Sequence, residues 1–124
     1  MTCSDDATLR LWDVKEKKMV EVTSLNKNID GNDLEMDPKT NELSDAAKAR
    51  SLDVIEDGKI VAVGFWNGNV KILSTANWKI MNEIAIAKEW ISDVKFSPNW
   101  KFLAYASHDN KVYVHTVHDM KKKF

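Results

Sequence analysis

Three histidines lie close together near the end of the chain, and imidazole is a common ligand for transition metals. His108 is expected in a turn, His115 in a strand and His118 in a charged segment. An odd step separates His115 from His118, so a strand would not point both rings to one face. No cysteine or carboxylate completes a standard zinc set. The pattern favours packing or surface histidines, and it predicts no metal site.

No other set of residues has the types and spacing of a catalytic site. A Ser/His/Asp arrangement, a phosphate-binding glycine loop and paired carboxylates with a base are all missing from the sequence pattern. The four glycines, at positions 31, 58, 64 and 68, occupy expected turns or strands. We therefore predict no catalytic residue, no cofactor and no enzyme activity. A regulatory module of an enzyme is the weakest of the hypotheses considered.

Short polar side chains recur at one position in three turns. Asp6, Asn67 and Asp109 stand 61 and 42 residues apart, each just before a predicted strand. Carboxylates and amides of this length bond readily to nearby backbone N–H groups. The pattern predicts that these residues cap turns and brace neighbouring strands, which is a structural role rather than a catalytic one.

These turns belong to a longer repeat. Residues 51–74 register with residues 93–116 at a shift of 42, and residues 4–13 match the end of a third copy. A period in the forties built from short strands is the signature of β-propeller blades. Alternating or continuous apolar runs predict strands at 8–11, 18–23, 50–55, 60–63, 70–72, 79–86, 102–106 and 112–114.

The unequal spacing locates an insertion of 19 residues within segment 26–47. This segment is acidic, poor in large apolar residues and interrupted by Gly31 and Pro38. We expect a long loop with one helical turn near 44–50. Loops of this length are usually functional or disordered. Two hypotheses therefore remain: a disordered or solvent-exposed loop without a binding role, or a loop that contacts a partner through Asp33, Glu35 and Asp37.

Four tryptophans are expected in loops or at strand ends, at positions 66, 78, 90 and 100. In a propeller such residues either cover the core between blades or anchor a partner. Trp66 and Trp100 adjoin turn residues and are the candidates for partner contact. The lysines at 121–123 are either a solvated linker or a contact for an acidic surface.

Composition bounds the class of protein. The chain has 124 residues, 44% of them hydrophobic and 30% charged, with a formal net charge of −1. That charge gives no support to nucleic-acid binding, and no apolar run is long enough for a membrane span. The start of the chain lacks the apolar core of a secretory signal. The single cysteine, Cys3, fits a reducing compartment.

Residues 4–13 resemble the closing strand of a WD40 repeat, with the Trp-Asp dipeptide intact at Trp12 and Asp13. Residues 91–98 and 103–114, which read ISDVKFSP and LAYASHDNKVYV, resemble the echinoderm microtubule-associated-protein-like family. The resemblance implies an all-β fold: a WD40-type β-propeller fragment of about two and a third four-stranded antiparallel blades. It also places Trp12 at a structural position.

The repeats divide the chain into the end of a blade at 1–13, a second blade at 14–75 with the acidic loop 26–47, and a third blade at 76–117, followed by a basic tail or linker at 118–124. Two departures from the family pattern stand out. The usual Gly-His dipeptide is missing before Ile91, and Leu73-Ser74 and His115-Thr116 replace Trp-Asp. The usual buried polar network cannot be complete. We expect an interior slice of one propeller, completed by further blades from the same or another chain.

The resemblance implies a non-enzymatic scaffold that binds tubulin, microtubules or axonemal proteins, in the cytoplasm and cytoskeleton or in the cilium or flagellar axoneme. The alternative is a generic WD40 scaffold for protein–protein interaction in a signalling or trafficking complex. Neither reading includes nucleic acid, a membrane or a cofactor.

Overall fold

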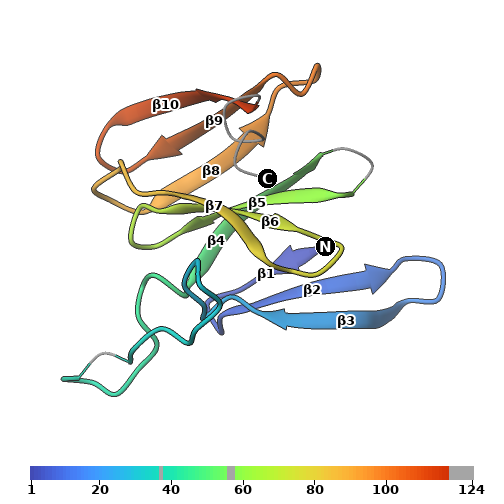
Figure 1. Cartoon of the computed structure of the whole chain (residues 1–124), viewed down its shortest axis with the longest axis horizontal. Coiled ribbons are helices and arrows are strands. Elements are labelled where there is room, and N and C mark those ends of the chain that lie inside the picture. The colour runs from blue at the N-terminus through green and yellow to red at the C-terminus, as the bar shows by residue number, and fades with distance from the viewer. Residues whose placement is uncertain (37, 56–57, 118–124) are drawn as a thin grey trace.

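The computed structural model describes residues 1–36, 38–55 and 58–117, and within them the chain forms three antiparallel β-sheets (Figure 1). The first sheet holds β1 (Thr2–Cys3), β2 (Thr8–Asp13) and β3 (Lys18–Ser24). The second holds β4 (Ala49–Ile55), β5 (Ile60–Phe65), β6 (Val70–Ser74) and β7 (Ile80–Ile84). The third holds β8 (Ile91–Phe96), β9 (Phe102–Ser107) and β10 (Lys111–Thr116). The predicted all-β class is confirmed, and the sheets are consistent with WD40 blades.

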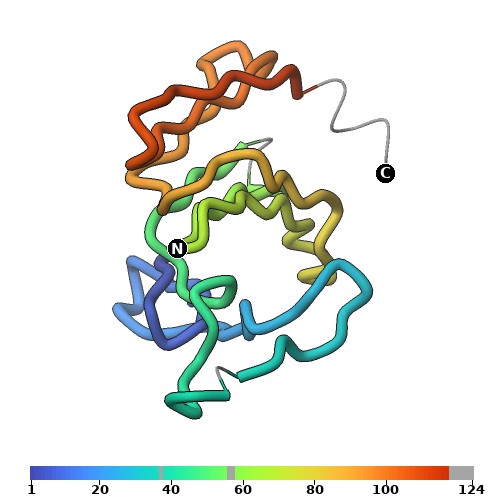
Figure 2. The backbone as a smooth tube through the Cα atoms, turned by 90° about the vertical axis from the view of Figure 1, so that its left-hand side faces the viewer, coloured from blue at the N-terminus to red at the C-terminus, as the bar shows by residue number. Residues whose placement is uncertain are grey.

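The sheets follow one another as layers, with the second between the other two (Figures 1 and 2). In each sheet, consecutive strands pair in chain order. The sheets are offset by one strand from the predicted segments 14–75 and 76–117, because β3 pairs with β2 and β7 pairs with β6. Each of these two segments therefore has its first strand in one sheet and its remaining strands in the next, which connects neighbouring sheets through the chain itself.

The middle sheet is the best buried of the three. All six residues of β5 are buried, as expected for a strand covered on both faces. By contrast, β10 shows alternating burial, and Val112 and Val114 on it are 71% and 62% exposed. The difference follows from position, because the middle sheet has a neighbour on each side and the third sheet has one.

Two apolar clusters fill the spaces between the sheets. One lies between the second and third sheets and contains Ile60, Ala62, Val70, Ile72, Ile91, Val94, Leu103 and Tyr105 among its members. The other lies between the first and second sheets and consists of Leu9, Leu25, Ala49, Val61, Val63, Phe65 and Leu73. Alternate residues of β5 belong to different clusters, so this strand connects both.

The second and third sheets pack directly on each other. Strand β8 contacts both β4 and β5. At Gly64 the approach is so close that an added Cβ would lie 2.6 Å from Cγ2 of Ile91. The backbone N–H of Phe96 donates to Oδ2 of Asp53 across the junction at 2.8 Å. This junction combines apolar packing with a satisfied polar contact.

The insertion enters the space beside the first and second sheets. The ammonium of Lys71 donates to the carbonyl oxygens of Lys27 at 2.8 Å and Ala46 at 3.2 Å. It also lies 4.6 Å from the ring centroid of Phe65, within cation–π range. Lys71 is only 1% exposed. The two carbonyls lie near opposite ends of segment 26–47, so one buried side chain holds both ends of the insertion.

The insertion has local order of its own. Residues 26–34 form a tight hairpin in which Lys27 bridges Asp33 through the backbone and through a side-chain ion pair. The side chain of Asn28 accepts from the backbone of Asp30 and Asn32, both at 3.0 Å. The expected helical turn near 44–50 is wrong. Ser44 closes a simple turn instead, and strand pairing begins at Ala49.

Within the described residues, no helix has the length and apolar character needed to cross a membrane.

Candidate functional site

The three repeated turn residues make the same local bond. The backbone N–H two residues later donates to the side-chain oxygen of Asp6, Asn67 and Asp109, at 3.0 Å in each case. Thr8 adds a hydroxyl bond to Asp6, which is the main cause of the lowered pKa of that carboxyl. The repeat therefore fixes one turn geometry in all three sheets, through an Asx turn.

Asp109 does more than cap its own turn. Its Oδ2 accepts from the hydroxyl of Tyr113 at 2.6 Å and from the backbone N–H of Lys88 at 3.2 Å. The Tyr113 bond is the main cause of the lowered pKa of Asp109. Lys88 lies in the link from β7 to β8. Asp109 thus joins its turn to the connection between the second and third sheets.

Trp12, the tryptophan of the intact Trp-Asp dipeptide, lies on β2 next to an irregularity in the pairing with β3. Its indole N–H donates to the hydroxyl of Thr2 on β1 at 2.9 Å. The side chain is 42% exposed. Within the described residues, Trp12 links strands of the first sheet and contacts no other blade through a hydrogen bond.

The described histidines are used in ring packing. The ring of His108 stacks on Trp90 with centroids 3.4 Å apart. His115 stacks on Tyr105 and shares a 2.9 Å hydrogen bond with its hydroxyl. Burial lowers the pKa of His115, and burial is also the main cause that raises the pKa of Tyr105 to about 12. His118 lies outside the described residues.

Within the part of the chain that the structure describes, no three His, Cys, Asp or Glu side chains gather closely enough to hold a metal ion. The single thiol is also poorly placed for chemistry. Burial, assisted by the charge of Asp5, raises the pKa of Cys3 to about 11. The thiol is therefore protonated near neutral pH and is a weak nucleophile.

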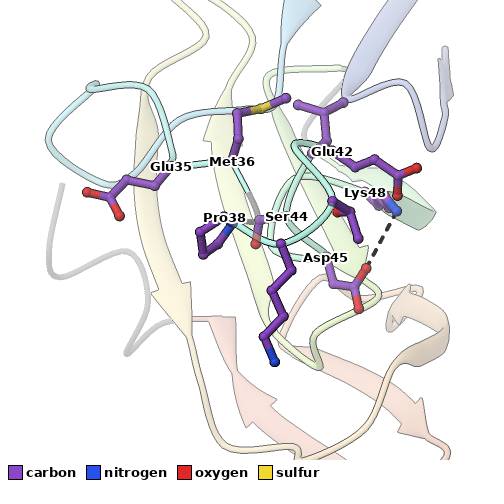
Figure 3. A pocket seen from close by; sticks show the side chains of 10 residues that line it. Glu35, Met36, Pro38, Glu42, Ser44, Asp45 and Lys48 are labelled. Atoms are coloured by element: carbon purple, nitrogen blue, oxygen red, sulfur yellow. Dashed lines mark ion pairs between the residues drawn. The ribbon is translucent and has the colours of Figure 1, made fainter.

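The acidic insertion forms an open pocket of about 720 Å³ (Figure 3). Its walls come from the insertion itself, including Glu35, Met36 and Glu42, and an ion pair between Asp45 and Lys48 lies at one side. Asp33, a candidate contact, is engaged by Lys27 in the adjoining hairpin. Asp37 lies outside the described residues.

The two candidate tryptophans lie at opposite ends of the sheets. Trp100 precedes β9 at the β8–β9 turn and is 45% exposed. Trp66 follows β5 at the β5–β6 turn and is half-buried. Trp90 contacts both Trp66 and His108, which follows β9, so the turn of Trp66 lies at the same end of the sheets as His108. The structure therefore does not bring the two tryptophans into one site.

Trp66 instead belongs to a row of contacting side chains that we call the blade-end ladder: Asp5, Arg50, Trp66, Trp90 and His108. The indole N–H of Trp66 donates to Oδ1 of Asp5 at 2.6 Å. The rings of Trp66 and Trp90 lie 5.2 Å apart, tilted by 41°. The guanidinium carbon of Arg50 lies 4.9 Å from the Trp66 ring and 4.3 Å from the Trp90 ring. The ladder crosses all three sheets.

Three members of the ladder occupy one repeat position. Asp5, Trp66 and His108 each directly precede the turn residue that caps the next strand. Two of them also make equivalent backbone hydrogen bonds. The N–H of Trp66 donates to the carbonyl of Lys48, and the N–H of His108 donates to the carbonyl of Trp90, each at 3.0 Å. The sequence register could have brought these three together. Arg50 and Trp90 carry no such repeat signal, and only the packing of the sheets adds them.

Similarity to known proteins agrees with the blade architecture. Echinoderm microtubule-associated protein-like 2 from Mus musculus is 32% identical over 117 residues, or 94% of this chain. The 77 kDa echinoderm microtubule-associated protein from Strongylocentrotus purpuratus is 25% identical over the whole chain. The ciliary WD repeat-containing protein ctxp80 from Euplotoides octocarinatus is 29% identical over 98% of it. No protein-family model matches the chain.

The chain is therefore distantly homologous, over nearly its whole length, to echinoderm microtubule-associated-protein-like proteins and to a ciliary WD repeat protein. The resemblance predicted from residues 91–114 is confirmed at that level. The chain spans 15% of the length of the first two relatives named above and 18% of the third. Together with the antiparallel sheets, the homology indicates a WD-repeat scaffold.

Proposed function

We propose that this chain is part of a non-enzymatic, microtubule-associated scaffold whose blades hold loops in fixed positions for partner proteins. The observation that carries the proposal is the homology over nearly the whole chain to proteins named as microtubule-associated or ciliary. The geometry supports it, since rigid sheets with exposed aromatic and charged loops suit protein recognition. The setting we propose is the cytoskeleton, including the cilium.

The contact surface we propose is the blade end that carries Trp66. Trp66 is half-buried and flanked by charged side chains, which is the character of an interface anchor. Trp100, Asp33 and Glu35 lie elsewhere and would make separate contacts. The proposed blade boundaries remain 1–13, 14–75 and 76–117, with further blades from the same or another chain beside them.

Co-sedimentation tests the microtubule part of the proposal. The full-length protein is centrifuged with and without stabilised microtubules at low and at moderate salt. We expect the protein to pellet only when microtubules are present, and less at the higher salt, because exposed charge contacts are screened. A folded sample that stays in the supernatant at low salt contradicts the proposal.

The second candidate is a WD40 scaffold in a signalling or trafficking complex. The formal net charge of −1 favours it, because that charge supplies no general attraction to an acidic polymer surface. Proximity labelling in ciliated cells separates the two. Enrichment of axonemal proteins supports the first candidate, and enrichment of trafficking proteins without them supports the second.

A further inference from the structure

Arg50 supplies the guanidinium group of the blade-end ladder. It is exposed, and its guanidinium lies against the rings of Trp66 and Trp90. Within the described part of the chain it forms no ion pair or side-chain hydrogen bond. Stacking restrains the guanidinium plane and leaves its N–H edges free to donate.

A guanidinium held in this way matches a carboxylate. Arginine N–H groups form a planar fork that binds the two oxygens of a carboxylate side by side, and a stacked fork loses less entropy on binding. The neighbouring indole rings of Trp66 and Trp90 are partly exposed and can contact an apolar side chain of the same partner. The site therefore offers one charge-assisted contact next to an aromatic surface.

The acids around the ladder limit what can bind. Asp5 already accepts from the indole of Trp66, and Asp109 accepts from Tyr113 and from two backbone N–H groups. Glu89 is exposed beside Trp90. These carboxylates would repel a run of acidic residues. A partner with one carboxylate beside an apolar side chain meets less of that repulsion.

We propose that the blade-end ladder binds a protein segment that presents a single glutamate or aspartate next to an apolar side chain, with Arg50 taking the carboxylate and Trp66 and Trp90 covering the apolar group. This inference deepens the proposed function, on which it rests, by naming the chemistry of the partner at this surface. Asp5 and His108 position the two indoles from the neighbouring sheets.

The test is an NMR titration of the full-length protein with two matched probes, N-acetyl-phenylalanyl-glutamate amide and N-acetyl-phenylalanyl-glutamine amide. We expect the glutamate probe to shift the side-chain N–H signal of Arg50 and the indole signals of Trp66 and Trp90 saturably. Binding of the glutamine probe should be about tenfold weaker, because the charge-assisted bond is lost. Equal binding of both probes overturns the proposal.

Variants assign the effect to Arg50. Arg50→Gln should weaken the glutamate probe about tenfold, and Arg50→Lys should recover part of the affinity because it keeps the charge without the fork. Lys101→Gln is the matched control, since it removes an exposed charge at the opposite end of the sheets. The backbone spectrum reports folding of each variant. Equal losses in Arg50→Gln and Lys101→Gln contradict the proposal.

Failure here is distinguishable from failure of the proposed function. If the wild-type protein pellets with microtubules but shows no preference for the glutamate probe, the inference is wrong and the proposed function stands. If the glutamate probe binds through Arg50 and the protein does not pellet, the ladder stands and the microtubule proposal is wrong.

Discussion

The two junctions between sheets solve the same packing problem in different ways. Between the second and third sheets, strands pack directly, and Gly64 lets Ile91 approach to a distance that no other residue would allow. Between the first and second sheets, the insertion supplies carbonyl groups to the buried ammonium of Lys71. One junction is close and apolar, and the other contains a charged group with fixed polar partners.

The two junctions should therefore respond differently to mutation. A close junction has no spare volume, so even one added carbon disturbs it. A junction with a buried charge keeps its stability only while the polar partners stay in place. We therefore expect the second–third junction to be sensitive to size, and the first–second junction to be sensitive to hydrogen bonding.

The largest predicted effect comes from Gly64→Ala. The new Cβ would lie 2.6 Å from Cγ2 of Ile91, 2.8 Å from Oγ of Ser51 and 2.9 Å from Cβ of Ile91. Forcing these atoms apart should lower the free energy of unfolding by about 3 kcal/mol, at the upper end of the usual cost of overpacking. Urea unfolding of the full-length protein measures the loss.

The same substitution at Gly31 is the control. Nothing lies within 4 Å of an added Cβ there, but the backbone φ of +85° is unfavourable for alanine. We expect a loss of about 1 kcal/mol from backbone strain alone. A second variant, Gly64→Ala with Ile91→Ala, should lose less than the two single losses added together, since the closest clash, with Cγ2 of Ile91, is removed. An equal loss at both glycines would mean that close packing does not distinguish this junction.

A smaller effect is predicted for the polar contact in the same junction. Asp53→Ala removes the acceptor of the Phe96 N–H, and an unpaired buried donor costs about 2 kcal/mol. Asp53→Asn keeps one acceptor and should cost less. Thermal unfolding of the two variants shows which of them loses more stability. Asp93→Ala serves as control, because Asp93 accepts the same local bond from the next residue but, among the residues that the structure describes, none across the junction.

Lys71→Met tests the first–second junction. It separates the contribution of Lys71 to global stability from its contribution to holding the insertion in place. Replacing a buried charge by an apolar side chain of similar length is often close to neutral for stability. The carbonyls of Lys27 and Ala46 nevertheless lose their donor, so local opening of the insertion should become easier. We expect a change in the global free energy of unfolding of less than about 1 kcal/mol, with cleavage after Glu35 and Glu42 about fivefold faster.

A glutamate-specific protease provides that measurement, under conditions where opening is fast relative to cleavage. Lys95→Met is the control, since Lys95 is exposed on the third sheet, away from the insertion. Cleavage that speeds up equally in both variants would show that Lys71 does not hold the insertion. A large loss of global stability without faster cleavage would place Lys71 in the core instead.

The smallest predicted effect concerns pH. Hydrogen bonds hold the pKa of Asp109 below its ordinary 3.8, so its ionised form stabilises the folded state above that value, and the contribution is lost as pH falls through the lower folded-state pKa. Asp109→Asn should therefore melt at a lower temperature than wild type near pH 5, with the gap closing near pH 2. Asp6→Asn, whose partners stay within the first sheet, should show the same sign. A difference in melting temperature between wild type and Asp109→Asn that grows as the pH falls would contradict a stabilising role for the ionised carboxyl.

Much of the fold could be predicted because each repeated strand is indicated twice, by its local apolar pattern and by its match to another copy of the repeat. The apolar run at 60–63 and the alternation at 8–11 indicate strands, and the 42-residue register fixes which of them correspond. The turn residues were found in the same way, since Asp6, Asn67 and Asp109 recur in register. The helical turn near 44–50 was wrong, because pairing of Ala49 with Phe65 outweighs local preference.

The candidate site was harder to predict, because its members come from unrelated positions. Trp66 is identified by its place beside a turn and Trp90 only as one of four tryptophans expected in loops or at strand ends, whereas Arg50 has no distinguishing local pattern. Lys71 lies in the alternating pattern of residues 70–72, and it is 1% exposed in the structure. Its partners are backbone carbonyls, which every residue carries and which leave no trace in a sequence.

The amino-acid sequence by itself determined the strands, the repeat, the turn caps and the length of the insertion. These depend on local periodicity and on spacing along the chain, both of which can be counted. Only the tertiary structure decided which side chains stack across the blade ends, how close Gly64 lies to Ile91 and where the ammonium of Lys71 finds its acceptors. Those features depend on distances between segments that are remote in the chain, and sequence periodicity carries no information about such distances.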